Sequence, residues 1–271
     1  MGRVFMYLSF DGSAYHGWQV QPNSSTVQEA VERALSTLFS HPVSITAAGR
    51  TDAGVSALMM PVHFDFSDDK DRARLDDGKH SFEEQLKYRL NRILPREIAV
   101  NNVLRVTNDA HARFSATSRT YRYYITEQKD PFRYKYRLQV PYSLDFPAMN
   151  KAAKTLLGTH DFDCFAKAHP DTKTSICTVT NAEWQKDEDR EWHFEITANR
   201  FLRNMVRAIV GTLLDVGKGK MAPQDILTIL DSRSRSEAGE SVKGEALFLT
   251  NVTYPCDIFL RENVHGTIKA I

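Results

Sequence analysis

Hydrophobic and polar residues alternate along the first part of the chain with the periods of strands and helices. Residues 3–10 are apolar on both faces, which predicts a strand at the centre of a sheet. Thr26 and Glu29 have capping-box spacing before apolar residues at helical spacing, so a helix is predicted to follow Thr26. A second helix is predicted at 81–93, and further strands at 43–48, 61–66 and 98–106. This order favours a split β-α-β unit.

The charged run at 67–80 is predicted to be a surface insertion. In the second part of the chain, a strand rich in Arg and Tyr is predicted at 113–127, with Tyr121 and Tyr123 on one face and Arg122 on the other. Helices are predicted near 148–157, 199–216 and 223–229, and strands at 175–184, 192–198 and 246–254. We therefore expect two halves, residues 1–110 and 111–271, that share one continuous sheet.

Composition limits the class of protein. The chain has 271 residues, of which 42% are hydrophobic, and its net charge is +1. No apolar run approaches the roughly 18 residues that a membrane helix needs, and no signal-peptide layout is visible. Three isolated cysteines are typical of a reduced, cytoplasmic protein. The near-neutral charge does not by itself indicate a nucleic-acid binder, although arginines gathered on one face would suffice.

Cofactor and metal motifs are missing from the sequence. Its nine histidines are scattered, and none pairs with another His or with Cys at ligand spacing. The chain contains no phosphate-binding loop, dinucleotide fingerprint or Gly-x-Ser-x-Gly elbow. We therefore expect neither a metal nor a cofactor.

The strongest candidate for chemistry is Asp52, in the run AGRTDAGV at residues 48–55. Gly49 and Gly54 flank it, and glycines let the backbone turn sharply and let a ligand approach closely. A carboxylate on such a loop can reach a substrate. The alternative is a plain Asx turn, in which Asp52 bonds only its own backbone.

A catalytic Asp52 would need a fixed cation nearby, since a nucleophile or base must be ionised. Arg203 and Arg207 are candidates because they lie at the edge of the apolar arc of the predicted 199–216 helix, as does Arg200. The alternative for Arg207 is a snorkelling side chain or a surface ion pair. Tyr121 and Tyr123 are candidates for stacking on an unpaired base, and the alternative is that they are core aromatics.

Several ordered stretches together resemble the TruA family of tRNA pseudouridine synthases. YHGWQ at 15–19 with TVQ at 26–28 resembles its N-terminal signature, and 48–55 resembles its catalytic loop. HARFSA at 111–116 and YRY at 121–123 resemble its central strand. HDF at 160–162 and FLRNMVR at 201–207, followed by IVG at 209–211, resemble a turn and a late helix of the family. These matches span nearly the whole chain.

The resemblance implies an α+β pseudouridine synthase fold, with two ferredoxin-like, split β-α-β halves that share a continuous, mostly antiparallel sheet. It implies that Asp52 is the catalytic aspartate, that Tyr121 packs against the target uracil and that Arg207 pairs with Asp52. It also implies conversion of uridine to pseudouridine at positions 38, 39 and 40 of the tRNA anticodon stem-loop, by a homodimer without metal or cofactor. Basic residues should grip the RNA backbone, and our candidates are Arg50, Arg113, Arg119, Arg122, Arg200 and Arg203.

Some positions depart from the family pattern. Ser56-Ala57 stands where the family has His-Ala, residues 175–178 lack a common arginine, and 244–249 fit the C-terminal pattern only loosely. Two other hypotheses therefore stay open. One is a non-catalytic RNA-binding relative, which needs the basic face but not the pair of Asp52 and Arg207. The other is an unrelated small-molecule enzyme, which would show no salt-dependent binding of tRNA.

Overall fold

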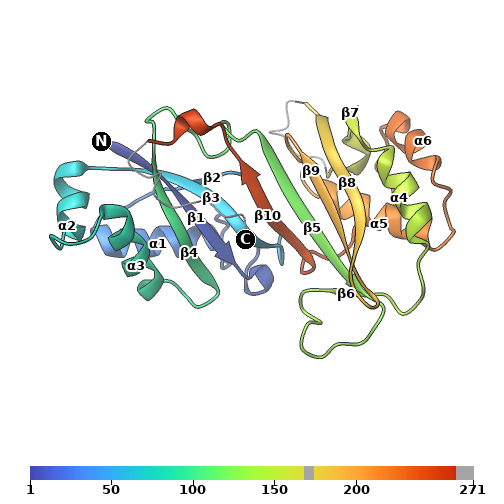
Figure 1. Cartoon of the computed structure of the whole chain (residues 1–271), viewed down its shortest axis with the longest axis horizontal. Helices are drawn as coiled ribbons and strands as arrows, with labels where there is room; N and C mark the ends of the chain where they lie inside the picture. The colour runs from blue at the N-terminus through green and yellow to red at the C-terminus, as the bar shows by residue number, and fades with distance from the viewer. Residues whose placement is uncertain (168–173, 261–271) are drawn as a thin grey trace. The chain divides into compact units, whose positions relative to one another are not determined.

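The structure is a computed structural model that describes residues 1–167 and 174–260. The chain divides into two compact units (Figure 1). The first comprises Met1–Thr51, Ala57–Thr117 and the chain from Val252, and the second comprises Asp52–Ser56 and Ser118–Asn251. The short segment Asp52–Ser56 thus belongs with the second unit, although both of its sequence neighbours belong to the first.

The first unit is built on three antiparallel strands in the order β4, β1, β3, and a short β2 pairs with β3. Its regular elements are β1 (Gly2–Phe10), α1 (Val27–Phe39), β2 (Thr46–Ala47), β3 (Ser56–Phe66), α2 (Ala73–Leu75), α3 (Phe82–Ile93) and β4 (Ile98–Val106). The predicted central strand is confirmed, because β1 pairs on both edges and its apolar side chains Val4, Phe5, Met6 and Leu8 are fully buried.

Local side-chain hydrogen bonds explain where the helices of this unit begin. The Thr26 hydroxyl accepts a hydrogen bond from the Glu29 amide ahead of α1. Ser81 and Glu84 form a complete capping box ahead of α3. The 67–80 insertion is less superficial than expected, because Leu75 in α2 is fully buried. One apolar residue therefore anchors this charged segment to the core.

In the second unit, β5, β9, β8 and β7 pair antiparallel in that order, β10 neighbours β5, and β6 pairs parallel to β5. Helix α4 packs on β8 and against α5. The regular elements are β5 (Ser118–Thr126), β6 (Leu138–Gln139), α4 (Phe146–Lys154), β7 (Gly158–Asp161), β8 (Ile176–Glu188), β9 (Glu191–Ala198), α5 (Met205–Gly217), α6 (Asp225–Ser232) and β10 (Leu247–Thr253). The predicted α+β class with mostly antiparallel strands is confirmed.

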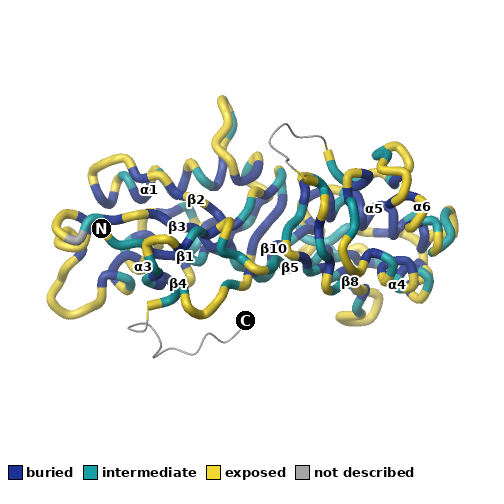
Figure 2. The backbone as a smooth tube through the Cα atoms, turned by 90° about the horizontal axis from the view of Figure 1, so that it is seen from above, coloured by how far each residue is buried: buried dark blue, intermediate teal, exposed yellow. Residues whose placement is uncertain are grey.

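Helix α5 is the buried helix of the second unit (Figure 2). All of its residues are buried except Arg207 and Asp215. It lies so close to a following loop that a Cβ on Gly211 would approach the Glu240 carbonyl oxygen to 1.8 Å. Arg207 is therefore a lone cation on an otherwise buried, tightly packed support.

The start of α5 corrects a prediction. The helix was expected from residue 199 but begins at Met205, because Asn204 adopts a left-handed conformation with φ 66°. The Asn204 amide also donates a hydrogen bond of 2.6 Å to the Ser241 hydroxyl. Arg200 and Arg203 therefore precede the helix and do not share a helical face with Arg207.

Two strand boundaries also differ from the predictions. Strand β5 begins at Ser118 instead of residue 113, and the preceding residues form a turn. Strand β3 begins at Ser56 instead of residue 61, so Ser56-Ala57, which departs from the family pattern, lies at the start of a strand. Ser56 itself is buried.

A histidine pair, His63 buried and His111 half-buried, lies in the first unit. The rings of His63 and His111 are 4.6 Å apart between centroids, and His63 is 7% exposed. The Ala112 amide donates to Nδ1 of His63 over 3.1 Å. Burial, the neighbouring His111 and the charge of Arg3 lower the pKa of His63 to about 4, and burial lowers that of His111 too.

Acid should consequently destabilise the fold in a defined window. An unfolded histidine takes up its proton near pH 6.5, whereas His63 in the fold resists protonation until about pH 4. The unfolded state therefore binds more protons between these values, and the free energy of unfolding should fall by about 1.4 kcal/mol per pH unit for this group. Urea unfolding at pH values between 6.5 and 4.5 gives the free energy of unfolding as a function of pH. The slope of that free energy against pH should be shallower for His63→Asn, whose amide oxygen can still accept from Ala112.

His80→Asn is the control, since contact with Asp77 raises the pKa of His80. The substitution should change the pH dependence of the free energy of unfolding only above pH 6.5. Between pH 6.5 and 4.5 the slope of that free energy against pH should match the wild type. An unchanged slope in His63→Asn would contradict the assignment of this acid sensitivity to His63.

Candidate active site

The loop that carries Asp52 turns sharply before β3. The Val55 amide donates to the Asp52 carbonyl over 3.2 Å, and Gly54 has φ +78°, a conformation that favours glycine. The Asp52 side chain is 26% exposed. Its carboxylate is thus partly open to solvent on a turn whose shape depends on the glycine two residues later.

Arg207 holds the Asp52 carboxylate from the buried helix α5. Its Nη1 lies 3.1 Å from Oδ2 of Asp52, and its side chain is 24% exposed. Its Nε donates to the Val242 carbonyl over 2.7 Å, and the Val242 amide donates back to the Arg207 carbonyl over 3.2 Å. Because two different N–H groups are engaged on two partners, the guanidinium is fixed in orientation as well as position.

The segment 242–246 contacts both Arg207 and the loop that carries Asp52. A Cβ on Gly244 would lie 2.4 Å from the Ala53 carbonyl oxygen, so the backbone there touches the Asp52 loop. Glu245 packs on Gly54, with its Cγ 3.3 Å from the position that a Cβ would take. The sequence analysis noted residues 244–249 only as a loose fit to the family pattern and did not place them beside Asp52; Gly244 is the residue that could have signalled a close backbone approach.

Tyr121 on β5 lies near enough to Asp52 for the carboxylate charge to affect the pKa of the tyrosine hydroxyl. Burial raises the pKa of its hydroxyl to about 12, with the Asp52 charge acting in the same direction and Arg119 against it. Its ring packs edge-on against Phe201 at 5.1 Å between centroids, and the residue is only half-buried. Tyr123, on the same face of β5, is fully buried in the core. Of the two tyrosines, Tyr121 is therefore the one with surface left for a ligand.

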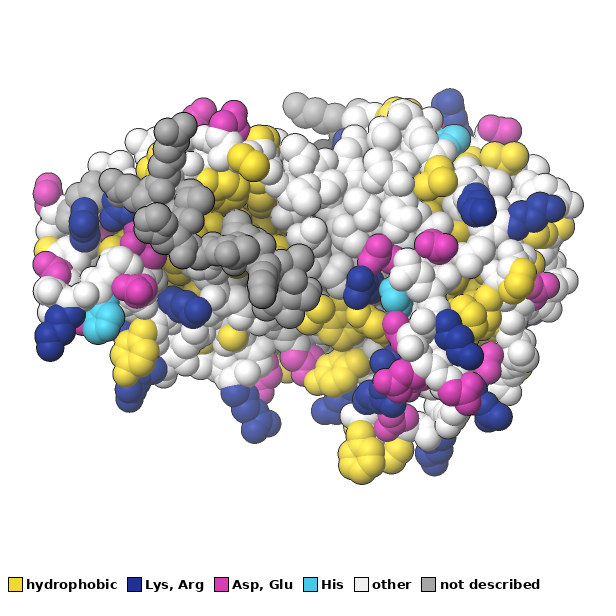
Figure 3. Space-filling view, viewed as in Figure 1, with side chains coloured by type: hydrophobic (Ala, Val, Ile, Leu, Met, Phe, Trp, Pro, Cys, Tyr) yellow, Lys and Arg dark blue, Asp and Glu magenta, His cyan; other side chains and the backbone are white. Residues whose placement is uncertain are grey.

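The six arginines proposed for RNA contact fall into two groups. Arg119 donates to the Asn199 carbonyl over 2.7 Å, and Arg122 forms an ion pair with Glu195 at 2.8 Å, so both are held by protein groups. The other four differ in exposure, since Arg50, Arg113 and Arg203 are exposed and Arg200 is half-exposed. On the face seen in Figure 3, basic and acidic side chains are interspersed, in keeping with the net charge of +1.

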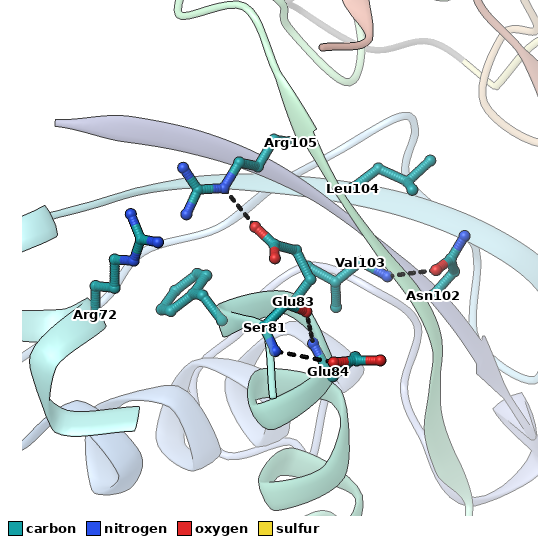
Figure 4. Close-up of a pocket in the computed structure, with 9 residues that line it drawn as sticks. Arg72, Ser81, Glu83, Glu84, Asn102, Val103, Leu104 and Arg105 are labelled. Carbon is teal, nitrogen blue, oxygen red and sulfur yellow. Dashed lines mark hydrogen bonds and ion pairs between the residues drawn. The ribbon is translucent and has the colours of Figure 1, made fainter. Parts of the chain in front are cut away.

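A hollow of about 410 Å³ in the first unit contains none of the proposed site residues (Figure 4). It lies between the start of α3 and β4, where Glu83 pairs with Arg105. Nor do the described residues include a group of three or more His, Cys, Asp or Glu side chains placed to hold a metal ion. His169 and His265 lie outside the residues that the structure describes.

Residues 1–167 and 174–260 include no helix with the length and apolarity needed to cross a membrane. Cys164 and Cys177 are buried, and burial raises the pKa of these thiols to about 12 and about 11. Neither is therefore a reactive thiolate at neutral pH.

Comparison with known proteins links this geometry to one family. A family model described as tRNA pseudouridine synthase matches residues 152–255. A tRNA pseudouridine synthase A of Bacteroides thetaiotaomicron is 49% identical over 273 residues, which cover 100% of this chain and 97% of that protein. Proteins with the same name from Porphyromonas gingivalis and Bacillus subtilis are 48% and 37% identical; they cover 96% and 93% of this chain, and the matches span 100% and 99% of those proteins.

Proposed function

Because the chain belongs to the tRNA pseudouridine synthase A family and is an isomerase of tRNA uridine, we propose that its targets are positions 38, 39 and 40 of the anticodon stem-loop. This choice of target rests on the family resemblance, whereas the catalytic part of the proposal rests on the Asp52 carboxylate, which is partly exposed and held at 3.1 Å by Arg207. Its flanking glycines, its ion pair with Arg207 and the half-buried Tyr121 nearby support a reacting role for Asp52 over a simple turn.

The reaction needs no external group. The N1–C1′ bond of uridine breaks, the uracil rotates, a C5–C1′ bond forms, C5 loses a proton and N1 gains one. In our proposal Asp52 starts this sequence, as a nucleophile or as a base, without metal or cofactor. Arg207 orients the carboxylate, and the hydrogen bond to Val242 prevents the guanidinium from following the substrate.

Tyr121 is proposed to pack against the flipped uracil. Since the pKa of its hydroxyl is about 12, the hydroxyl keeps its proton at neutral pH, so it can hydrogen-bond the base but is not a phenolate base. The target base must leave the stem, so the exposed arginines would grip the RNA backbone while it does so. We propose that the enzyme works in the cytoplasm as a homodimer, so that one RNA stem can contact the basic residues of two subunits.

The direct test is to map pseudouridine in unmodified tRNA after incubation with the purified protein. Carbodiimide labelling and primer extension should detect the product at positions 38, 39 and 40 of transcripts that carry uridine there. A transcript with cytidine at all three positions should stay unmodified. Product only at other positions would refute the anticodon-arm assignment but not the isomerase.

A further inference from the structure

The turn that precedes β5 is unusually well braced for a surface loop. Nδ1 of His111 accepts hydrogen bonds from the amides of Arg113 and Phe114, at 3.1 and 3.3 Å. The His111 amide donates to the Ser115 hydroxyl, and the Ser115 amide donates to the His111 carbonyl, both over 2.9 Å. The loop is therefore closed on itself around one imidazole ring.

This loop is also tied to the core of the first unit. The His111 ring packs on the buried His63, and the amide of Ala112 donates to that same residue. The Tyr254 hydroxyl donates to the Ala112 carbonyl over 2.6 Å. Hydrogen bonds from the loop to two buried or half-buried side chains leave it little freedom to change shape.

What the braced loop presents to solvent is an aromatic ring beside a cation. Phe114 is 75% exposed, although its backbone is fixed. Its ring lies 4.3 Å from that of His111 at 33°, and the Arg113 guanidinium is 5.7 Å from its centroid. A single exposed apolar side chain is ordinary. An exposed ring on a braced backbone, beside an exposed arginine, combines the aromatic face and the positive charge that proteins use to stack unpaired bases.

We propose that Phe114 is a nucleobase-stacking site, which receives an unpaired base of the tRNA substrate while Arg113 contacts the adjacent phosphate. The inference rests on the proposed function for the identity of the RNA. Because the loop is braced before RNA arrives, its backbone loses little conformational freedom on binding. His63 and His111 hold the loop that carries Phe114 in place, through their ring contact and the hydrogen bonds they accept from loop amides.

The test measures binding of unmodified tRNA to the full-length protein by filter retention over a range of salt concentrations. Phe114→Ala should raise Kd by about 5- to 150-fold, the range for loss of one base–aromatic stack, with an unchanged slope of log Kd against log salt. Phe114→Trp should bind like the wild type. Arg113→Gln should instead flatten the slope by about 0.7 to 0.9, because one phosphate contact is lost.

Phe132→Ala is the matched control, since Phe132 is 90% exposed on a loop of the second unit. Its Kd should equal that of the wild type. A wild-type Kd in Phe114→Ala, an equal loss in Phe132→Ala or a wild type that does not bind tRNA would each overturn the stacking site. Dissociation of Phe114→Ala into monomers in size-exclusion chromatography would also overturn it, because the ring would then contact a second copy of the chain.

The proposed function fails separately. A wild type that binds tRNA without forming pseudouridine would refute the isomerisation, while the Kd values would still decide the role of Phe114. Conversely, full turnover with an unaltered Kd in Phe114→Ala would refute only the stacking site.

Discussion

Asp52→Asn should lower pseudouridine formation by at least about 10³-fold, because the amide can act neither as a nucleophile nor as a base. Binding of tRNA should change little, since asparagine keeps the shape of the side chain. The measurement is tritium release from tRNA whose uridines are tritiated at C5, at saturating enzyme. Asp52→Ala should behave in the same way and guards against slow reversion of asparagine to aspartate.

Asp65→Asn is the matched control for this substitution. Asp65 also pairs with an arginine, Arg3, at 2.6 Å, but it lies in the first unit on β3. Its replacement should leave tritium release within about two-fold of the wild type, as for surface ion pairs of small energetic effect. Normal release by Asp52→Asn would end the proposal. Loss of release with tRNA still bound would place Asp52 at the reaction without distinguishing its two possible roles.

Much of the fold could be predicted because the strands carry continuous or alternating apolar runs. The exceptions are positions where one side chain overrides the pattern. Asn204 interrupts a helical pattern by a hydrogen bond to Ser241, a residue 37 positions later. His111 supplies the partners that a strand ladder would otherwise give to residues 113 and 114, so that β5 starts late. Neither the long-range contact of Asn204 nor the local contacts of His111 leave a periodic signal.

The site could be predicted only in part for a similar reason. Asp52 and Arg207 are 155 positions apart. The helix pattern left both Arg203 and Arg207 open as the partner of Asp52, and only the family resemblance selected Arg207. The third member, Val242, takes part through its carbonyl and amide, so its side chain gives no sign of the role. We propose roles for Asp52, Arg207 and Tyr121. The contact with Val242 bears on the role of Arg207, because it fixes the guanidinium that holds the Asp52 carboxylate.

Arg207→Gln should lower the rate at saturating tRNA by about 10²- to 10³-fold, the usual cost of losing one preorganised donor at a reacting group. Arg207→Lys should recover only part of this, because one ammonium cannot reach both Val242 and Asp52 in the fork geometry of a guanidinium. The decisive measurement is a double-mutant cycle on kcat. If Arg207 acts through the carboxylate, Arg207→Gln should cost almost nothing further in the Asp52→Asn background.

Arg233→Gln is the control for this cycle, since Arg233 approaches another carboxylate of the second unit, Asp161, at 3.5 Å. Its effect on kcat should be small in both backgrounds. Additive losses from Arg207→Gln and Asp52→Asn would show that the arginine contributes by another route, such as direct contact with the RNA. A large drop in the free energy of unfolding would show instead that its bond to Val242 mainly supports α5. A positioning role requires a stable protein, a lower kcat and a tRNA affinity close to that of the wild type, because only then is the loss confined to the orientation of Asp52.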